Sequence, residues 1–197
     1  MALLSGLGEI TTNFLLNDFS VYVMNTTATG GYVSTEWELL GFTSAEKTIN
    51  RNNEKYEKEG KIPRVLQYTK TIRKNLEVSF DLSNYNTTYI AELTQATKID
   101  LGATGTKLSH GTTESAKIYR AYLFTADLDD GQHYNLVIDK GDAVQSGEQT
   151  LGGETETVFP LTIKATYNAA ANATANLYSE YLITSSQNAT SVLPAAF

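Results

Sequence analysis

The chain has 197 residues, 41% of them hydrophobic, and a formal net charge of -7. This length fits one domain with a full hydrophobic core. Because there is no cysteine, the sequence excludes a disulfide framework, a thiolate nucleophile and a cysteine-ligated metal site. The acidic balance disfavours binding to nucleic acid unless basic residues are segregated from the rest of the surface.

The start of the sequence, MALLSGLGEITTNF, has no basic region and only a broken apolar run. We therefore expect no signal peptide. No window approaches the roughly 18 uninterrupted apolar residues of a membrane-spanning helix, so we expect no such helix either. These patterns indicate a chain that is made and folded in a cytosol.

The first predicted strands lie in the N-terminal part of the chain. Residues 18–25 (DFSVYVMN) form a short strand, and residues 37–50 form a longer one in which Gly41 marks a bulge or bend. A further strand follows Pro63. In residues 75–82 (NLEVSFDL) polar and apolar side chains then alternate, which predicts a half-buried strand. The apolar face holds Leu76, Val78, Phe80 and Leu82, and the polar face holds Glu77, Ser79 and Asp81.

Between these strands lies a charged segment, residues 50–64 (NRNNEKYEKEGKIPR). Five of its residues are basic and three are acidic, which gives an excess of +2 on an acidic chain. The segment has little apolar surface to bury, so we expect a loop that is mobile in the free subunit and orders against a partner. Residues 127–156 contrast with it, because they hold eight acidic residues and one lysine. The two regions suggest self-association, and ordinary solvated surfaces are the alternative.

One helix is expected, over residues 86–97. Asn86 is a suitable N-cap. The apolar residues that follow it recur at helical spacing, and they form a stripe about one helix face wide: Tyr89, Ile90, Leu93 and Ala96. A Gly/Thr-rich loop is expected next, over residues 100–115 (DLGATGTKLSHGTTES).

After this loop the chain returns to strands. Asp130-Gly131 predicts a tight hairpin turn between strands over 116–128 and 132–140. Residues 157–167 (TVFPLTIKATY) form the last strong strand.

Pro160 in that strand has no backbone N–H to donate to a neighbouring strand, so we expect it at the edge of a sheet or at a bulge.

Residues 168–197 carry one charge, Glu180, and predict an extended C-terminal arm that is strand in part. The whole pattern predicts a mainly β fold: a two-sheet antiparallel β-sandwich or open barrel with one flanking α-helix.

Signatures of catalysis or of a bound metal are weak. His110 and His133 lie beside turns and have no partners at metal-ligand spacing. DLDDG (127–131) lacks the alternation of a calcium loop, and GATGTK (102–107) departs from the phosphate-loop pattern. The sequence has no G-x-S-x-G motif. We therefore predict no catalytic residues, no cofactor and no metal site.

The order of the motifs resembles that of the major tail tube proteins of long-tailed bacteriophages. TEWELLGFTSAEKTI (35–49) provides the Trp and the Leu-Gly pair, and the charged segment and a Pro-led strand follow it. LEVSFDLSNYN (76–86) then leads into the helix, and an Asp-Gly hairpin precedes VFPLTIKA (158–165). The resemblance covers about residues 18–167, and the order and spacing of the motifs carry it.

The resemblance implies a two-sheet β-sandwich that assembles as hexameric rings, with the rings stacked into a tail tube. The type VI secretion tube protein is similar in fold. Double-stranded DNA would pass through the tube without specific binding, and no membrane would be involved. The partners would be the chain itself and the tape-measure, tail terminator and distal tail proteins. The location would be the virion tail, assembled in the host cytoplasm.

In this interpretation residues 1–167 form the tail-tube domain, with the long charged loop at 50–64, and residues 168–197 form the arm. Some family members carry a C-terminal immunoglobulin-like domain, and a 30-residue arm is too short to be one.

Three sets of residues are the expected sites. The inter-ring assembly loop would use basic and apolar residues of the charged segment: Arg51, Lys55, Tyr56, Lys58, Lys61, Ile62 and Arg64. It would meet an acidic partner surface: Asp127, Asp129, Asp130, Asp139, Asp142, Glu148, Glu154 and Glu156. The candidates for the channel lining are Glu77, Ser79 and Asp81, and a solvated outer face is the alternative for these three.

A carbohydrate-binding β-sandwich module is the second functional hypothesis. Trp37 and the many tyrosines on a β scaffold with acidic loops are a combination that sugar-binding proteins also use. An enzyme is the third, and it lacks a recognisable catalytic motif.

Overall fold

The computed structural model describes residues 19–24, 37–59, 66–111, 117–128, 132–147, 158–167 and 177–183. The strands are β1 (Ser20–Met24), β2 (Trp37–Glu59), β3 (Leu66–Tyr85), β4 (Thr97–Asp100), β5 (Thr106–Ser109), β6 (Arg120–Asp127), β7 (His133–Gln145), β8 (Phe159–Ala165) and β9 (Tyr178–Ile183). The helices are α1 (Thr87–Leu93) and the short 3-10 helix η2 (Gly102–Thr104). Neither of these described helices has the length and apolar character that crossing a membrane requires.

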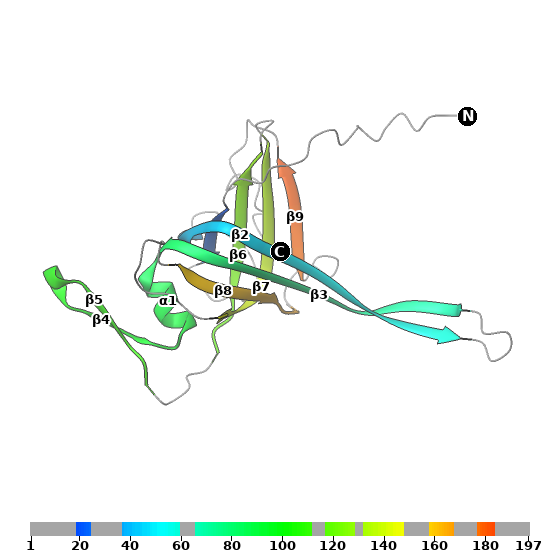
Figure 1. Ribbon diagram of the computed structural model, residues 1–197, viewed down its shortest axis with the longest axis horizontal. Helices are drawn as coiled ribbons and strands as arrows, with labels where there is room; N and C mark the ends of the chain where they lie inside the picture. The colour runs from blue at the N-terminus through cyan, green and yellow to red at the C-terminus, as the bar shows by residue number, and fades with distance from the viewer. Residues whose placement is uncertain are drawn as a thin grey trace.

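Six strands close into an antiparallel barrel in the order β6, β1, β2, β3, β8 and β7 (Figure 1). Closure depends on β7, which pairs with β6 along His133–Gly141 and with β8 along Gly141–Gln145. The mainly β class and the single flanking α-helix are confirmed within the described residues. The described strands close into a barrel, whereas the sequence predicted two sheets or an open barrel.

The barrel interior is filled by the alternating apolar residues. Leu76, Val78, Phe80 and Leu82 of β3 are all buried there, which confirms the predicted half-buried strand. The rings of Phe80 and Phe124 meet edge to face with their centroids 5.2 Å apart, a geometry that aromatic pairs favour.

Two glycines allow close packing in this barrel. The predicted bulge at Gly41 is confirmed, because the β2–β3 register shifts there. A methyl group at Gly41 would lie 2.9 Å from the backbone oxygen of Asn84. At Gly141, the residue at which β7 changes partners, a methyl group would lie 2.5 Å from the ring of Tyr122.

The β2 and β3 strands continue past the barrel as a two-stranded ribbon, which extends to the right in Figure 1. Their pairing runs on from Asn50 opposite Glu77 to Glu59 opposite Leu66. The prediction of a loop over 50–64 is therefore wrong for residues 50–59, and residues 60–65 lie outside the described residues. Charge density suggested the loop, but backbone pairing between two strands satisfies their N–H and C=O groups without apolar side chains. The expected disorder-to-order step is also not needed, because this pairing forms within a single chain.

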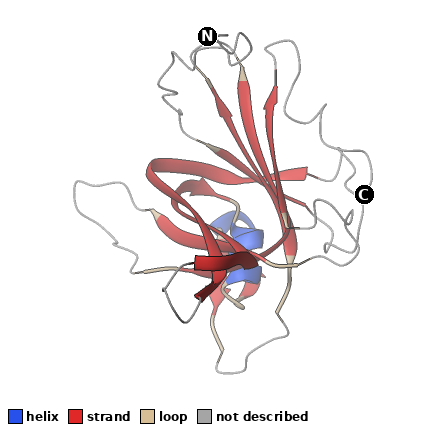
Figure 2. Cartoon of the chain, turned by 90° about the vertical axis from the view of Figure 1, so that its right-hand side faces the viewer, coloured by secondary structure: helices blue, strands red, loops and turns tan. Residues whose placement is uncertain are grey.

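The predicted helix forms with the predicted cap. The backbone N–H of Thr88 donates to the Asn86 side chain at 3.0 Å, and Tyr89 and Ile90 are buried in the core. Figures 1 and 2 show α1 packed against the strands. The helix ends at Leu93, earlier than expected, and Gln95 has a φ of 55°.

The predicted Gly/Thr loop at 100–115 is only partly a loop. Thr97–Asp100 pairs with Thr106–Ser109, so β4 and β5 form a short hairpin. This hairpin lies at the left in Figure 1, on the opposite side of the barrel from the β2–β3 ribbon.

Part of the C-terminal arm is a strand, as predicted. β9 pairs antiparallel with His133–Ile138 of β7. The other residues of the arm lie outside the described part of the chain, as does the Asp130-Gly131 turn, although the two strands that flank that turn do pair.

Candidate functional site

Four barrel strands, β2, β3, β8 and β7, present a polar outer surface that we call the polar sheet face. Its polar members are these outward residues of the four strands: Thr48, Asn50, Glu77, Ser79, Asp81, Asp142, Thr162 and Lys164. Thr162 is buried, and the apolar Pro160 and the exposed Val144 lie on the same side of the sheet. The three residues predicted to line a channel therefore share one face, because their neighbours Leu76, Val78 and Phe80 point into the core.

Cross-strand contacts order this face. Ser79 Oγ and Thr162 Oγ1 share a hydrogen bond of 2.9 Å, and Lys164 Nζ lies 3.5 Å from Glu77 Oε1. Lys164 is also opposite Asp142 in the β7–β8 register, and Lys117 Nζ donates to Asp142 Oδ2 at 2.6 Å. Charges of opposite sign thus alternate in a row across β3, β8 and β7.

The net charge of the face is small. Among its members, Glu77, Asp81 and Asp142 oppose Lys164, which leaves -2. Lys117, which reaches Asp142 from the segment before β6, brings the total to -1. The hydrogen bond from Lys117 to Asp142 raises the pKa of that lysine, so it stays charged. The face is weakly negative, and its charges are mostly paired.

The sheet that carries this face has an unpaired edge on each side within the described residues. β1 pairs with β2 only as far as Phe42, so β2 from Lys47 onward has β3 as its one strand partner. β6 pairs with β7 only as far as Gly141, so residues 142–145 pair with β8 alone. Free sheet edges are sites where another strand can add.

The predicted inter-ring loop is divided by the structure. Lys55, Tyr56 and Lys58 belong to β2 in the ribbon. Lys61, Ile62 and Arg64 lie outside the described residues, so their predicted role stays a prediction.

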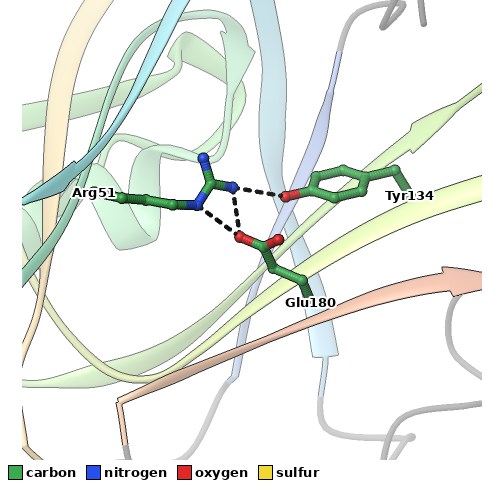
Figure 3. A network of polar contacts seen from close by, with 3 residues as sticks. All are labelled: Arg51, Tyr134 and Glu180. Atoms are coloured by element: carbon green, nitrogen blue, oxygen red, sulfur yellow. Dashed lines mark hydrogen bonds and ion pairs between the residues drawn. The ribbon is translucent and has the colours of Figure 1, made fainter. Parts of the chain in front are cut away.

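Arg51, the first residue of that set, lies at the base of the ribbon and is already paired (Figure 3). Its Nε donates to Glu180 Oε1 at 2.9 Å, and its Nη2 donates to the same oxygen and to the Tyr134 hydroxyl at 3.3 Å. Burial lowers the pKa of Arg51, but the hydrogen bond to Glu180 and the charge of that carboxylate outweigh this and leave the pKa raised. The three side chains join β2, β7 and β9.

A groove of about 460 Å³ lies beside this network. Apolar and aromatic side chains make most of its lining, namely Ile49, Leu128, Tyr134, Tyr181 and Leu182, with Arg51 and Glu180 as its charged members. Burial raises the pKa of Tyr134 to about 12. Sequence reasoning missed this groove, since Arg51 and Glu180 are 129 residues apart and no local pattern pairs them.

The predicted acidic partner surface does not form as one surface. Asp139 is fully buried, so its assignment to a surface is wrong. It lies mid-strand in β7, where all residues from Asn135 to Asp139 are buried. Asp129, Asp130, Glu148, Glu154 and Glu156 lie outside the described residues.

Asp127 and Asp142 are exposed to different degrees and lie far apart. Asp127 is 75% exposed, pairs with His133 at 2.6 Å and lies opposite that residue at the start of β7. Asp142 is nine residues further along β7, roughly 30 Å away at the rise of a β-strand.

A second ion pair, which is more deeply buried, holds α1 against the barrel. Arg120 Nη2 donates to Glu92 Oε2 at 2.6 Å, and Nη1 donates to the backbone oxygen of Met24 at 2.9 Å. The guanidinium also lies 5.3 Å from the ring centroid of Tyr89. The hydrogen bond to Glu92 raises the pKa of Arg120 against the effect of burial.

We expect Arg120→Met to lower the free energy of unfolding by about 3 kcal/mol, because it leaves the Glu92 carboxylate without its partner in a partly buried position. Urea unfolding followed by circular dichroism measures this loss. The control is Lys164→Met, which breaks a pair in which both side chains are exposed, Lys164 by 55% and Glu77 by 40%, and should cost under about 1 kcal/mol. Equal losses in the two variants would contradict a special role for Arg120.

Within the described ranges, no three His, Asp or Glu side chains are grouped as a metal site would require. No family model matches the sequence, and a search of curated proteins found no significant match. The polar sheet face, its free edges and the projecting ribbon are the features of the described residues that bear on function.

Proposed function

We propose that this protein is the tube-forming subunit of a long bacteriophage tail, in which rings of identical chains stack around a channel for the genome. The observation that carries the proposal is the four-stranded sheet β2–β3–β8–β7, with a polar outer face and an unpaired edge at each side. The tail tube fold, the virion location and the tape-measure, tail terminator and distal tail partners follow from the resemblance of the sequence.

Ring closure would use the two free edges. All neighbouring strands of this sheet are antiparallel, so β2 and β7 run in opposite directions at its two edges. The β7 edge of one chain can therefore pair antiparallel with the β2 edge of the next. Repeating this contact around a rotation axis closes a ring and leaves no free edge in it.

In such a ring the polar sheet face would line the channel. A conduit for DNA must attract the phosphates weakly, because each lysine or arginine that contacts a phosphate adds a salt-dependent attraction. A face with a net charge of -1 and paired cations fits this requirement. Glu77, Ser79 and Asp81 remain our candidates for the lining.

Stacking would use the ribbon. Residues 51–59 and 66–74 hold six basic and three acidic residues, an excess of +3 that leaves -10 on the rest of the chain. A basic projection on an acidic body suits contact with the next ring of the same chain.

Negative-stain electron microscopy of the purified protein at high concentration tests the proposal. We expect rings with six-fold symmetry and a central hole, together with stacks of these rings. A folded chain that stays monomeric, even with a tail initiator complex present, would overturn it. Monomers that bind immobilised polysaccharide would instead favour the carbohydrate-binding alternative.

A further inference from the structure

The β4–β5 hairpin exposes apolar side chains at the end of the molecule opposite the ribbon. Ile99 is 40% exposed and Leu101 is 49% exposed. Apolar side chains gathered on a projection are typical of contact sites.

The tip of this hairpin is held rigidly by its own hydrogen bonds. Asp100 Oδ1 accepts from the Gly102 N–H at 2.8 Å, and the Leu101 N–H donates to the Gly105 oxygen at 2.9 Å. Gly102 and Gly105 supply positive φ angles of 64° and 122°, which favour glycine. Leu101 is thus presented in a fixed position, and binding would lose little conformational entropy.

The groove beside β9 is a complementary surface. Leu182 at its rim is 58% exposed, and the contacts among Arg51, Glu180 and Tyr134 hold its walls (Figure 3). The groove is lined by Ile49 and Arg51 of β2, just before that strand continues into the ribbon. The β4–β5 hairpin lies on the opposite side of the barrel from the ribbon (Figure 1). A chain therefore cannot fill its own groove with its own hairpin.

The charges of the two surfaces are opposite. In residues 97–109, Lys98 and Lys107 oppose Asp100, which leaves +1. In the lining of the groove Glu180 balances Arg51, and the exposed Asp127, which precedes the lining residue Leu128 and contacts His133, places a carboxylate beside the groove.

We propose that the β4–β5 hairpin of one chain docks into the groove beside β9 of a second copy, with Leu101 inserted against Leu182. This inference rests on the proposed function and names the contact between successive rings. Strands of a closed barrel tilt by about 35–45° from its axis, so the two ends of a strand lie at different heights along the axis and features at these ends can face neighbouring rings. Because the two surfaces differ, the contact is head to tail and repeats from ring to ring.

Paired cysteine substitutions test this contact, since the chain has no cysteine of its own. We expect assembled Leu101→Cys/Leu182→Cys protein, treated with a short bifunctional maleimide, to give dimers, trimers and longer ladders on a denaturing gel. Each single variant should give dimers at most. The matched control is Leu101→Cys/Tyr167→Cys, because Tyr167 is 66% exposed and lies outside the groove.

The outcomes separate this inference from the proposed function. The docking contact is supported if electron microscopy shows tubes and the Leu101→Cys/Leu182→Cys protein gives more cross-linked ladder than the control. Tubes whose cross-linking does not exceed the control overturn the docking contact and leave the tube function standing. Folded protein that forms no tubes overturns the tube function, and the docking contact with it. Unchanged thermal unfolding of the variants confirms that these exposed substitutions leave the fold intact.

Discussion

Removing the end of the β2–β3 ribbon is expected to leave a folded subunit that no longer forms long tubes. The variant lacks residues 54–73 and joins Asn53 to Lys74, which are opposite each other in the ladder, through an Asn-Gly turn. That dipeptide suits a two-residue hairpin. The barrel core and its closing pairs lie elsewhere, so the free energy of unfolding should change little.

The loss of assembly follows from the charge that is removed. Residues 54–73 hold six basic and three acidic residues, an excess of +3. Each exposed ion pair is worth under about 1 kcal/mol. The ribbons of all the chains in one ring contact the next ring at the same time, so the affinity between two rings greatly exceeds that of a single ribbon. Sedimentation and electron microscopy measure the length of the tubes. Assembly of the wild-type chain should also weaken as ionic strength rises, because salt screens exposed charges.

A charge-preserving variant, Lys55→Arg/Lys58→Arg, provides the control and should assemble normally. If the shortened variant forms tubes of ordinary length, the ribbon has no part in stacking. In that case the excess of +3 is only a solvated surface.

Local patterns in the sequence predicted the parts of the fold that depend on neighbouring residues. The alternation in 75–82 correctly separated Leu76, Val78 and Phe80 from the polar face, because the side chains of a strand point to opposite sides at every step. The Asn86 cap was predictable for a similar reason, since its partner is the Thr88 N–H.

Features that depend on distant parts of the chain were not predictable. Closure of the barrel needs β7 to change partners at Gly141, and no local pattern in the sequence marks that change. Asp139 appears in the sequence as one acid among many, and only the burial of β7 shows that it is internal. The ribbon was misjudged because residues 50–59 hold Tyr56 as their one aromatic side chain and no aliphatic one, while their order comes from pairing with residues 66–77.

The candidate site was predicted in the same uneven way. The three channel candidates share a face because they are every second residue of one strand. The groove beside β9 combines residues of β2, β7 and β9, and no periodicity links them.

Reversing charge on the polar sheet face should make the tube retain DNA. Glu77→Lys/Asp81→Lys changes the face from -1 to +3 for each chain. Both side chains lie on the outer surface of β3, so folding should survive, although the lysine that replaces Glu77 would face Lys164 at a cost under about 1 kcal/mol. We expect variant tubes, but not wild-type tubes, to cosediment with short duplex DNA. A plot of the logarithm of the affinity against the logarithm of the salt concentration should also become steeper. Its slope should change by about -0.9 for each lysine that contacts a phosphate.

Nuclease digestion then decides where this face lies. DNA held in a channel is enclosed by the ring, so the fraction retained by the variant should resist a nuclease that degrades free DNA. The variant Glu77→Asp/Asp81→Glu keeps the charge of the face and should behave as the wild type does. Retained DNA that is digested as fast as free DNA would place the polar sheet face on the outside of the tube. Glu77, Ser79 and Asp81 would then be ordinary solvated residues, and the channel wall would have to be formed by another surface of the barrel.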